Sequence, residues 1–440
     1  MADIVTSRVF VDGEKGITAA KLNDITASSV IQPAFYTSKP TAGTADPTDI
    51  ALILKSGAYA QVPVSTLGGS ATQAQIWSTR LRSFNAIGNP NFEVDQRNVG
   101  NPLISPASGA FVQDRWVLAK GGTLTAAVGT QQVTSNTVNV LVPGTSFCLS
   151  RAYQRITLTT AQASLGASDY LRILQTVEGV QFRELSQDVH SISLLVRSSV
   201  AGLNFGVTVA DSPTTRFLAA LCTIPTANTF TLINIPNLPV FPSGNFSTLP
   251  GAAGYTIGIA LACGTTLIAP AAGTWQSGNF IGVPGMSNFA ASPVNSTFDI
   301  AFVSHEPGSV CSTFMDKPFT QNYDECLRYY CKSYPYGVAP ATPNNSSGAI
   351  SIGPIATVNF SALLGWYPFP KKMAKSPNVV ALSTISGGGN AVRDLPNNLD
   401  RAVTSISQAG EAGYGGVNIT GQATSGNPWY NWHFVADTGW

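Results

Sequence analysis

The sequence predicts a mainly β protein, with a central antiparallel jelly-roll β-sandwich between a small N-terminal α+β module and a small C-terminal β domain. Three observations support this prediction. The 41 glycines and 28 prolines punctuate the chain at short intervals. Short runs rich in β-branched residues lie between these turn residues, as in sandwiches and barrels. Segments with helical spacing are few, and most of them lie outside the centre of the chain.

The N-terminal module is predicted to comprise residues 1–88. Residues 18–31 and 72–84 place apolar side chains at helical spacing and predict two short helices. Residues 50–66 predict a β-hairpin between them, with its turn at Lys55 to Ala58. Small domains bury little apolar surface. We therefore expect this module to be stabilised by a partner chain or by oligomerisation.

The strands of the sandwich are predicted from residue 91 onward. The clearest one is 229–235, where Phe230 and Leu232 share one face and Ile233 and Ile235 share the other, so that both faces are partly covered. Trp116 is predicted to point inward as a core anchor. Other candidate strands are 115–119, 132–142, 170–177, 191–197, 204–209, 256–262 and 298–303.

A third helix is predicted at residues 320–334, where Tyr323, Leu327 and Tyr330 lie three and four residues apart before Pro335. A linker rich in Pro, Asn and Ser follows, and strands resume at 350–360 and 432–437. The expected domains are 1–88, a sandwich at 89–338 that ends in this helix, and a C-terminal β-sandwich domain at 339–440.

Composition excludes several classes of protein. Charged residues make up 11% of the 440 residues, against about 25% in an average soluble protein. A net charge of +1 without a basic patch argues against binding to nucleic acid. No apolar run is long enough for a membrane helix, and the N-terminus lacks the apolar core of a signal peptide. We therefore expect synthesis in the cytoplasm and surfaces that are largely buried in an assembly.

Motifs for metal, cofactor or catalytic sites are not found in the sequence. None of the six cysteines forms a Cys-x-x-Cys pair, and no disulfide is expected between Cys326 and Cys331. Phosphate-binding loops and nucleophile elbows are also missing. The sequence therefore predicts no cofactor, no metal site and no catalytic residues.

The three histidines, His190, His305 and His433, lie far apart along the chain and are expected to be surface or satisfied core residues. Glu306 follows His305, as in an acid–base pair, but is expected in the loop after strand 298–303.

Aromatic residues are the best candidates for ligand binding, because saccharides stack their apolar C–H faces on exposed Trp and Tyr rings. The densest group lies at residues 427–433, near the C-terminus. The glycan-binding candidates are Trp429, Tyr430, Trp432 and Trp275. The alternative for Trp432, which lies in a predicted strand, is a place in the core or in a subunit interface.

Five segments, in this order, resemble a module common in bacteriophage tail-fibre and virion proteins: 89–97, 111–116, 170–176, 298–303 and 323–334. The resemblance implies a jelly-roll sandwich similar to carbohydrate-binding modules. Residues 370–379 resemble the start of the small β domain that follows this module, and residues 1–88 resemble a phage attachment segment. Related modules often carry a calcium motif, and no run of spaced Asp residues is found here.

The resemblance implies a non-enzymatic structural component of a bacteriophage virion, either a tail fibre or a tail appendage subunit. It would be a homotrimer anchored to other virion proteins through residues 1–88. Its sandwich domains would recognise host-surface polysaccharide. One alternative is a capsid decoration or head-fibre protein. Another is a polysaccharide-degrading enzyme, against which the lack of β-helix repeats and of acid pairs counts.

Overall fold

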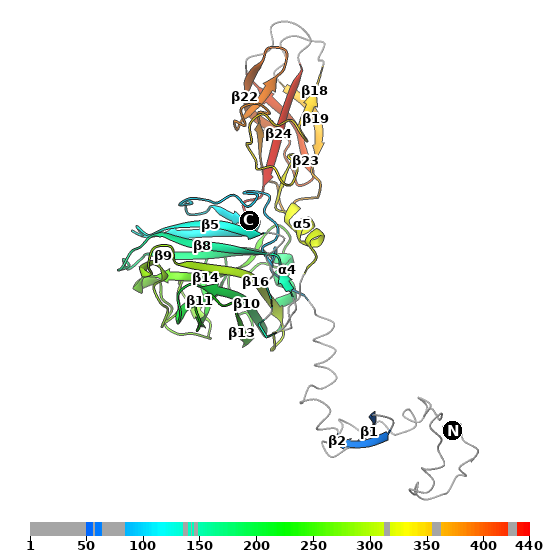
Figure 1. Cartoon of the computed structure of the whole chain (residues 1–440). Helices are drawn as coiled ribbons and strands as arrows, with labels where there is room; N and C mark the ends of the chain where they lie inside the picture. Colours follow the sequence, from blue (N-terminus) through cyan, green and yellow to red (C-terminus); the bar gives the residue numbers. More distant parts are fainter. Residues whose placement is uncertain are drawn as a thin grey trace, which may run out of the picture. The chain divides into compact units, whose positions relative to one another are not determined.

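A computed structural model gives the fold of the chain and divides it into two compact units, Met1–Ser78 and Thr79–Trp440. Figure 1 draws the whole chain. The residues that the structure describes are 50–55, 58–63, 84–134, 140–141, 143–144, 148–311, 317–353, 362–420 and 429–440. Within them, no helix is both long enough and apolar enough to cross a membrane.

The N-terminal unit contains the expected hairpin. Strands β1 (Ile50–Lys55) and β2 (Ala58–Pro63) pair antiparallel, and Lys55 lies opposite Ala58 at the turn. The hairpin prediction is therefore confirmed. The two helices expected at 18–31 and 72–84 lie outside the described residues.

The second unit begins with the predicted antiparallel sandwich, which has two sheets. The five-stranded sheet has the order β13-β10-β16-β8-β5, and the seven-stranded sheet has the order β15-β12-β11-β14-β9-β4-β3. The five-stranded sheet is formed by β5 (Ala127–Thr134), β8 (Ala152–Thr160), β10 (His190–Ser198), β13 (Thr231–Leu238) and β16 (Thr297–Pro307). The seven-stranded sheet is formed by β3 (Phe111–Gln113), β4 (Trp116–Gly121), β9 (Tyr170–Glu178), β11 (Leu203–Ala210), β12 (Arg216–Ile224), β14 (Ala253–Cys263) and β15 (Gln276–Ser277).

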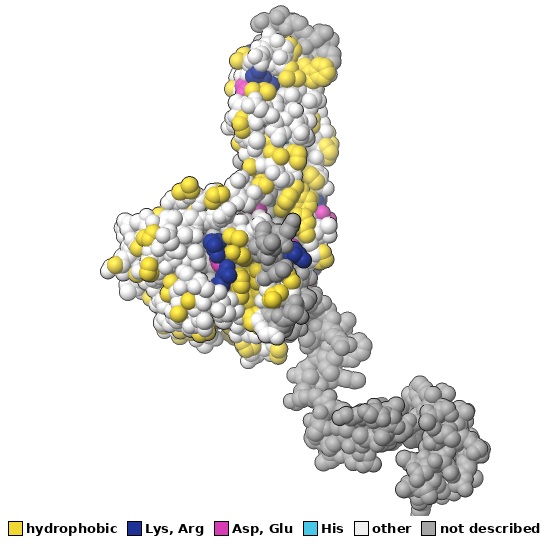
Figure 2. All heavy atoms as spheres, in the orientation of Figure 1, with side chains coloured by type: hydrophobic (Ala, Val, Ile, Leu, Met, Phe, Trp, Pro, Cys, Tyr) yellow, Lys and Arg dark blue, Asp and Glu magenta, His cyan; other side chains and the backbone are white. Residues whose placement is uncertain are grey.

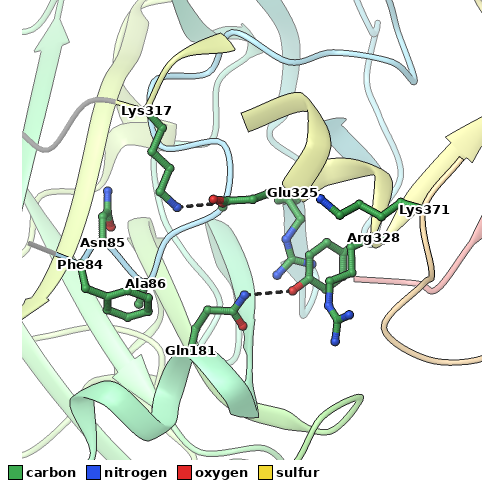
Figure 3. Close-up of a pocket in the computed structure, with 11 residues that line it drawn as sticks. Phe84, Asn85, Ala86, Gln181, Lys317, Glu325, Arg328 and Lys371 are labelled. Atoms are coloured by element: carbon green, nitrogen blue, oxygen red, sulfur yellow. Dashed lines mark hydrogen bonds and ion pairs between the residues drawn. The ribbon is translucent and has the colours of Figure 1, made fainter. Parts of the chain in front are cut away.

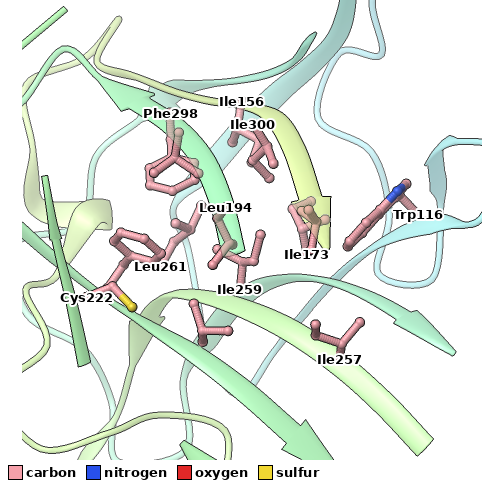
Figure 4. Close-up of a cluster of buried hydrophobic side chains, with 14 of the residues drawn as sticks. Trp116, Ile156, Ile173, Leu194, Cys222, Ile257, Ile259, Leu261, Phe298 and Ile300 are labelled. Carbon is pink, nitrogen blue, oxygen red and sulfur yellow. The ribbon is translucent and has the colours of Figure 1, made fainter. Parts of the chain in front are cut away.

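Side chains from the facing sides of both sheets form the main core (Figure 4). Ile156, Leu194 and Ile300 come from the five-stranded sheet, and Ile173 and Ile259 come from the seven-stranded sheet. Such interdigitation of two inner faces is what holds a sandwich together. Trp116 is fully buried in this core, and its indole N–H donates to the Asn89 carbonyl at 3.1 Å, as the inward orientation predicted.

Strand β13 confirms the prediction of a strand covered on both faces. Ile233 and Ile235 pack against the main core, whereas Phe230 and Leu232 pack against a second cluster on the outer face of the five-stranded sheet. A two-stranded hairpin of β6 (Val140–Leu141) and β7 (Cys148–Ser150) contributes to this second cluster.

The two α-helices of the described residues are short. Helix α4 (Gly179–Leu185) follows β9 directly and was not predicted. Helix α5 (Phe319–Leu327) corresponds to the prediction at 320–334 but ends earlier, because the next residues form β17 (Tyr330–Lys332). Tyr330 therefore lies in a strand and not on the helix. Two short 3₁₀ turns, Thr265–Leu267 and Phe289–Ala291, complete the helical segments.

The C-terminal domain is an eight-stranded antiparallel sheet built around β24 (Tyr430–Asp437). Strand β24 pairs with four others: β17, β18 (Ile350–Ile352), β20 (Asn378–Leu382) and β21 (Ala391–Asp394). The remaining strands are β19 (Ala362–Pro368), β22 (Leu399–Ser407) and β23 (Gly413–Ile419). Strand β17 belongs to this sheet although it precedes the expected domain boundary between residues 338 and 339. That boundary therefore does not coincide with the division between the sandwich and the C-terminal sheet.

Partly buried polar contacts join the sandwich to the C-terminal domain within the second unit. Arg97 forms an ion pair with Asp437 of β24. Arg328 pairs with the fully buried Glu178 at 2.7 Å, and the Lys332 ammonium donates to the Gln96 carbonyl at 2.7 Å. Partners that are buried together are costly to separate. The two domains are therefore held in contact by specific polar interactions.

Candidate functional site

A row of polar side chains crosses the outer face of the five-stranded sheet. Gln131, Arg155, Asp299 and Arg197 lie directly opposite one another on the adjacent strands β5, β8, β16 and β10. Their sequence neighbours point into the core, among them Ile156 next to Arg155, because successive residues of a strand face opposite sides. The register of the sheet thus aligns residues that are far apart in sequence.

Asp299 holds the two arginines of this row in place. Arg155 donates from Nε and Nη2 to the two carboxylate oxygens at 2.8 and 3.0 Å. Arg197 donates from Nε and Nη2 to Oδ2 at 2.9 and 2.6 Å. The Asp299 side chain is fully buried, whereas those of Arg155 and Arg197 keep 34% and 23% of their surface exposed. The buried carboxylate therefore orients two guanidinium groups that remain in contact with solvent.

Two aromatic rings border the row. Phe230 lies 4.4 Å from the Arg197 guanidinium carbon, measured to the ring centroid, and packs edge-on against Tyr153 at 5.8 Å. The Tyr153 hydroxyl accepts a hydrogen bond from Arg155 Nη2 at 3.3 Å. Phe230 is partly exposed, and Tyr153 is almost buried. The patch therefore combines an apolar edge with fixed cationic donors, an arrangement that cation–π contacts strengthen.

Donor groups of the row remain available. In the part of the chain that the structure describes, Nη1 of Arg155 and Nη1 of Arg197 make no hydrogen bond. Exposed Gln131 and partly exposed Thr157 add amide and hydroxyl groups beside them. Strands lie about 4.8 Å apart, so the face from β5 to β13 is about 19 Å wide. Figure 2 shows a basic patch bordered by hydrophobic side chains on the surface of the sandwich.

Part of this sheet face is covered by the β6–β7 hairpin. Val140 and Leu149 of the β6–β7 hairpin pack on Leu195, Ala301 and Phe302, which are fully buried. Among the described residues, the polar row and its aromatic border belong to the accessible part of the face. We call these residues (Gln131, Arg155, Asp299, Arg197, Tyr153 and Phe230) the sheet-face patch.

The four aromatic residues predicted from sequence as glycan-binding do not form one exposed surface. Trp432 and Tyr430 are buried core residues of the C-terminal domain, with 0% and 1% exposure, and the Trp432 indole donates to the Tyr414 hydroxyl at 3.1 Å. Neither ring presents a face to solvent. Trp275 is partly buried in the sandwich and donates to the Pro239 carbonyl at 3.1 Å. Trp429 alone of the four is exposed, at 45%.

His190 and His305 are core residues, one of the two places expected for them, but their contact with each other was not predicted from the sequence. His190 and His305 lie on neighbouring strands, with His305 Nε2 and His190 Nδ1 2.8 Å apart, and the Tyr255 hydroxyl contacts His305 Nδ1 at 2.7 Å. Burial lowers the pKa of His190 to about 4, and burial together with the neighbouring His190 lowers the pKa of His305 well below its usual value of 6.5. Both are therefore neutral hydrogen-bonded core groups at neutral pH.

Glu306 lies in a strand, and the cysteines form no disulfide bond. Glu306 lies inside β16 and not in a loop, because this strand continues to Pro307, and its carboxylate accepts a hydrogen bond from Ser304. All six cysteines are free thiols. Among the described residues, no group of three or more His, Cys, Asp or Glu is placed to hold a metal ion.

The chain matches no protein-family model and no curated protein. It is similar to solved structures of carbohydrate-binding modules. A family 61 module solved with β-1,4-galactotriose is 12% identical, with coverage of 51% of this chain and 99% of that chain and a TM-score of 0.25. A family 11 module from Clostridium thermocellum, solved with a mixed-linked tetrasaccharide, is 13% identical, with coverage of 48% and 98% and a TM-score of 0.24.

A further similar structure is the enzymatically active domain of tailspike protein 4 from bacteriophage CBA120. It is 13% identical, with coverage of 46% of this chain and 21% of that chain and a TM-score of 0.23. Identities this low bear on fold alone.

Proposed function

We propose that this protein is a structural subunit of a bacteriophage virion that binds a host-surface saccharide chain across its five-stranded sheet. The observation that carries the binding role is the sheet-face patch. Its arginines are held by a buried carboxylate and keep free donors, and an aromatic ring lies at its border. Ligand sites commonly combine apolar walls with a few fixed polar groups in this way.

The chemistry of the patch suits a sugar chain. Hydroxyl groups of a saccharide accept hydrogen bonds from guanidinium and amide donors, and its C–H faces pack on aromatic rings. A face about 19 Å wide accommodates several linked sugar rings rather than one. The net positive charge of the two arginines and one aspartate favours an anionic or neutral chain over a cationic one.

The virion role rests on the sequence resemblance and on the separation of the N-terminal unit. In this proposal, residues 1–88 attach the subunit to other virion proteins and three copies assemble around one axis. The proposal includes no enzymatic activity.

The binding role is tested by measuring affinity for host capsular or cell-wall polysaccharide with the full chain and with Arg197→Gln. A charge-assisted hydrogen bond is worth about 1.5–3 kcal/mol, so we expect roughly 10- to 100-fold weaker binding. Arg172→Gln, on β9 of the other sheet, removes the same charge and serves as the control. Equal affinities for all three proteins, or no binding to any surface glycan, would refute the proposal.

The virion and enzymatic aspects need separate tests. Antibody labelling of purified particles in electron microscopy should mark an external appendage, and unlabelled particles would end this part of the proposal. Incubation with the same polysaccharide should release no new reducing ends. Release of reducing ends would favour the alternative, a polysaccharide-degrading enzyme.

A further inference from the structure

A small cavity of about 180 Å³ lies beside helices α4 and α5, away from the sheet-face patch. Its wall includes Arg115, Lys317, Arg328 and Lys371 together with a single carboxylate, Glu325. Figure 3 shows Lys317 bonded to Glu325 on one side of the cavity and the side chain of Gln181 on another. The wall is therefore predominantly cationic.

Arg115 is held in this wall by an unusual backbone. It lies in the two-residue turn between β3 and β4 with a φ of 75°, a conformation that non-glycine residues rarely adopt. Gly88 makes room for its side chain, because a Cβ at that position would lie 3.1 Å from Arg115 Nε. Strained backbone of this kind persists only where the surrounding structure imposes it. The fold thus places the Arg115 guanidinium in the cavity wall.

The Arg115 guanidinium is buried without an acidic partner among the described residues. Arg115 is only 3% exposed, and its contacts are one hydrogen bond from Nη2 to the Thr176 carbonyl at 2.5 Å and the face of the Tyr329 ring at 3.5 Å. Nε and Nη1 are buried and have no hydrogen-bond partner in the described chain. Buried charges are normally paired. Within the described part of the chain, Arg115 is therefore a buried cation without an acidic partner.

The other cations of the wall have acidic partners. Arg328 is bonded to Glu178 at 2.7 Å, and Lys317 is bonded to Glu325 at 2.8 Å. Lys371 lies 3.6 Å from Asp324, and both of these side chains are largely exposed. Each of these pairs is neutral overall, so Arg115 is the cation of the wall that has no acidic partner among the described residues.

We propose that this cavity binds one small oxyanion, a carboxylate or phosphate group, with Arg115 as its principal partner and with Lys317 and Lys371 as secondary cations. Guanidinium groups form strong charge-assisted hydrogen bonds with both kinds of anion. The cavity admits a single anionic group and not a saccharide chain. This site is independent of the proposed binding of glycans.

The test is thermal unfolding and calorimetric titration of the full chain with inorganic phosphate, with acetate and with glucuronate, at ionic strength held constant with chloride. An anion that binds the native state raises its melting temperature. We expect a saturable rise with at least one of the three probes. Phosphate alone would indicate a phosphate source, whereas acetate or glucuronate would indicate a carboxylate.

Variants locate the site. Arg115→Gln should weaken anion binding about tenfold or more. Lys371→Gln changes an exposed side chain and should not affect folding. We expect this variant to weaken anion binding about threefold. Arg183→Gln, on α4 but 65% exposed, removes a nearby charge and should leave the affinity unchanged. No saturable rise with any probe, or equal affinity in wild type and Lys371→Gln, would overturn the proposal.

Discussion

Replacing Asp299 by Asn removes the charge that organises the sheet-face patch while keeping the size of the side chain. In the native protein this fully buried carboxylate receives four hydrogen bonds from Arg155 and Arg197, at 2.6 to 3.0 Å. The side-chain oxygen of Asn can accept only some of these four hydrogen bonds, and the NH₂ group of Asn would face the guanidinium donors of both arginines. The variant therefore leaves two neighbouring guanidinium groups without a counter-charge.

The expected loss of stability follows from the burial of the three groups. Removing one partner of a fully buried ion pair costs about 3–5 kcal/mol. Arg155 and Arg197 are 34% and 23% exposed, so both can turn partly toward water. Solvent screening reduces the cost, and we expect the free energy of unfolding to fall by about 2–3 kcal/mol.

Equilibrium urea denaturation of wild type and Asp299→Asn measures this difference. Glu184→Gln is the matched control, because Glu184 is 53% exposed and its contact with Arg183 at 3.4 Å is a surface ion pair. We expect a change below about 0.5 kcal/mol for the control. If Asp299→Asn is as stable as the control, the carboxylate does not hold the arginines and our interpretation of the patch is wrong.

Two further predictions concern pH and the aromatic residues. Burial raises the pKa of Asp114 from 3.8 to about 7, although the Arg97 charge and the Gln96 backbone N–H oppose this shift. The folded state therefore favours the protonated form of Asp114. As pH rises between these two values, the free energy of unfolding is expected to fall by up to about 4 kcal/mol. Urea denaturation at several pH values should show that Asp114→Asn becomes more stable relative to wild type as pH rises, and a constant difference would contradict this. Thermal unfolding should show that Trp432→Ala lowers the free energy of unfolding by about 3–5 kcal/mol, because Trp432 is buried. Trp429 is exposed, so Trp429→Ala should lower it by less than about 0.5 kcal/mol. Equal losses for the two variants would contradict the assigned burial.

Local patterns in the sequence predicted those elements of the fold that depend on local physics. The two-faced strand at 229–235 was evident from alternation alone, and the hairpin at 50–63 from two apolar runs around a short turn. Trp116 followed from its strand position. Helix α5 was predicted too long because pairing of Tyr330–Lys332 with β24 overrides the helical spacing of the local sequence.

The candidate site depended on information that one sequence does not contain. Arg155, Arg197 and Asp299 are adjacent only because three strands pair in one register, and a shift of one residue would place them in the core. The same is true of His190 and His305, which are 115 residues apart in sequence and in contact in space. Composition pointed instead to the aromatic cluster near the C-terminus, where burial removes Tyr430 and Trp432 from the candidates.

Hydroxyl-radical footprinting with and without a bound host polysaccharide tests the central claim most directly, because it reports side-chain exposure at named residues. Phe230 borders the sheet-face patch and is partly exposed, whereas Trp429 and Trp366 are exposed at 45% and 57% in the C-terminal domain. The account predicts that the glycan protects Phe230 from oxidation and leaves both tryptophans unchanged. Protection of Trp429 or Trp366 with Phe230 unchanged would contradict it.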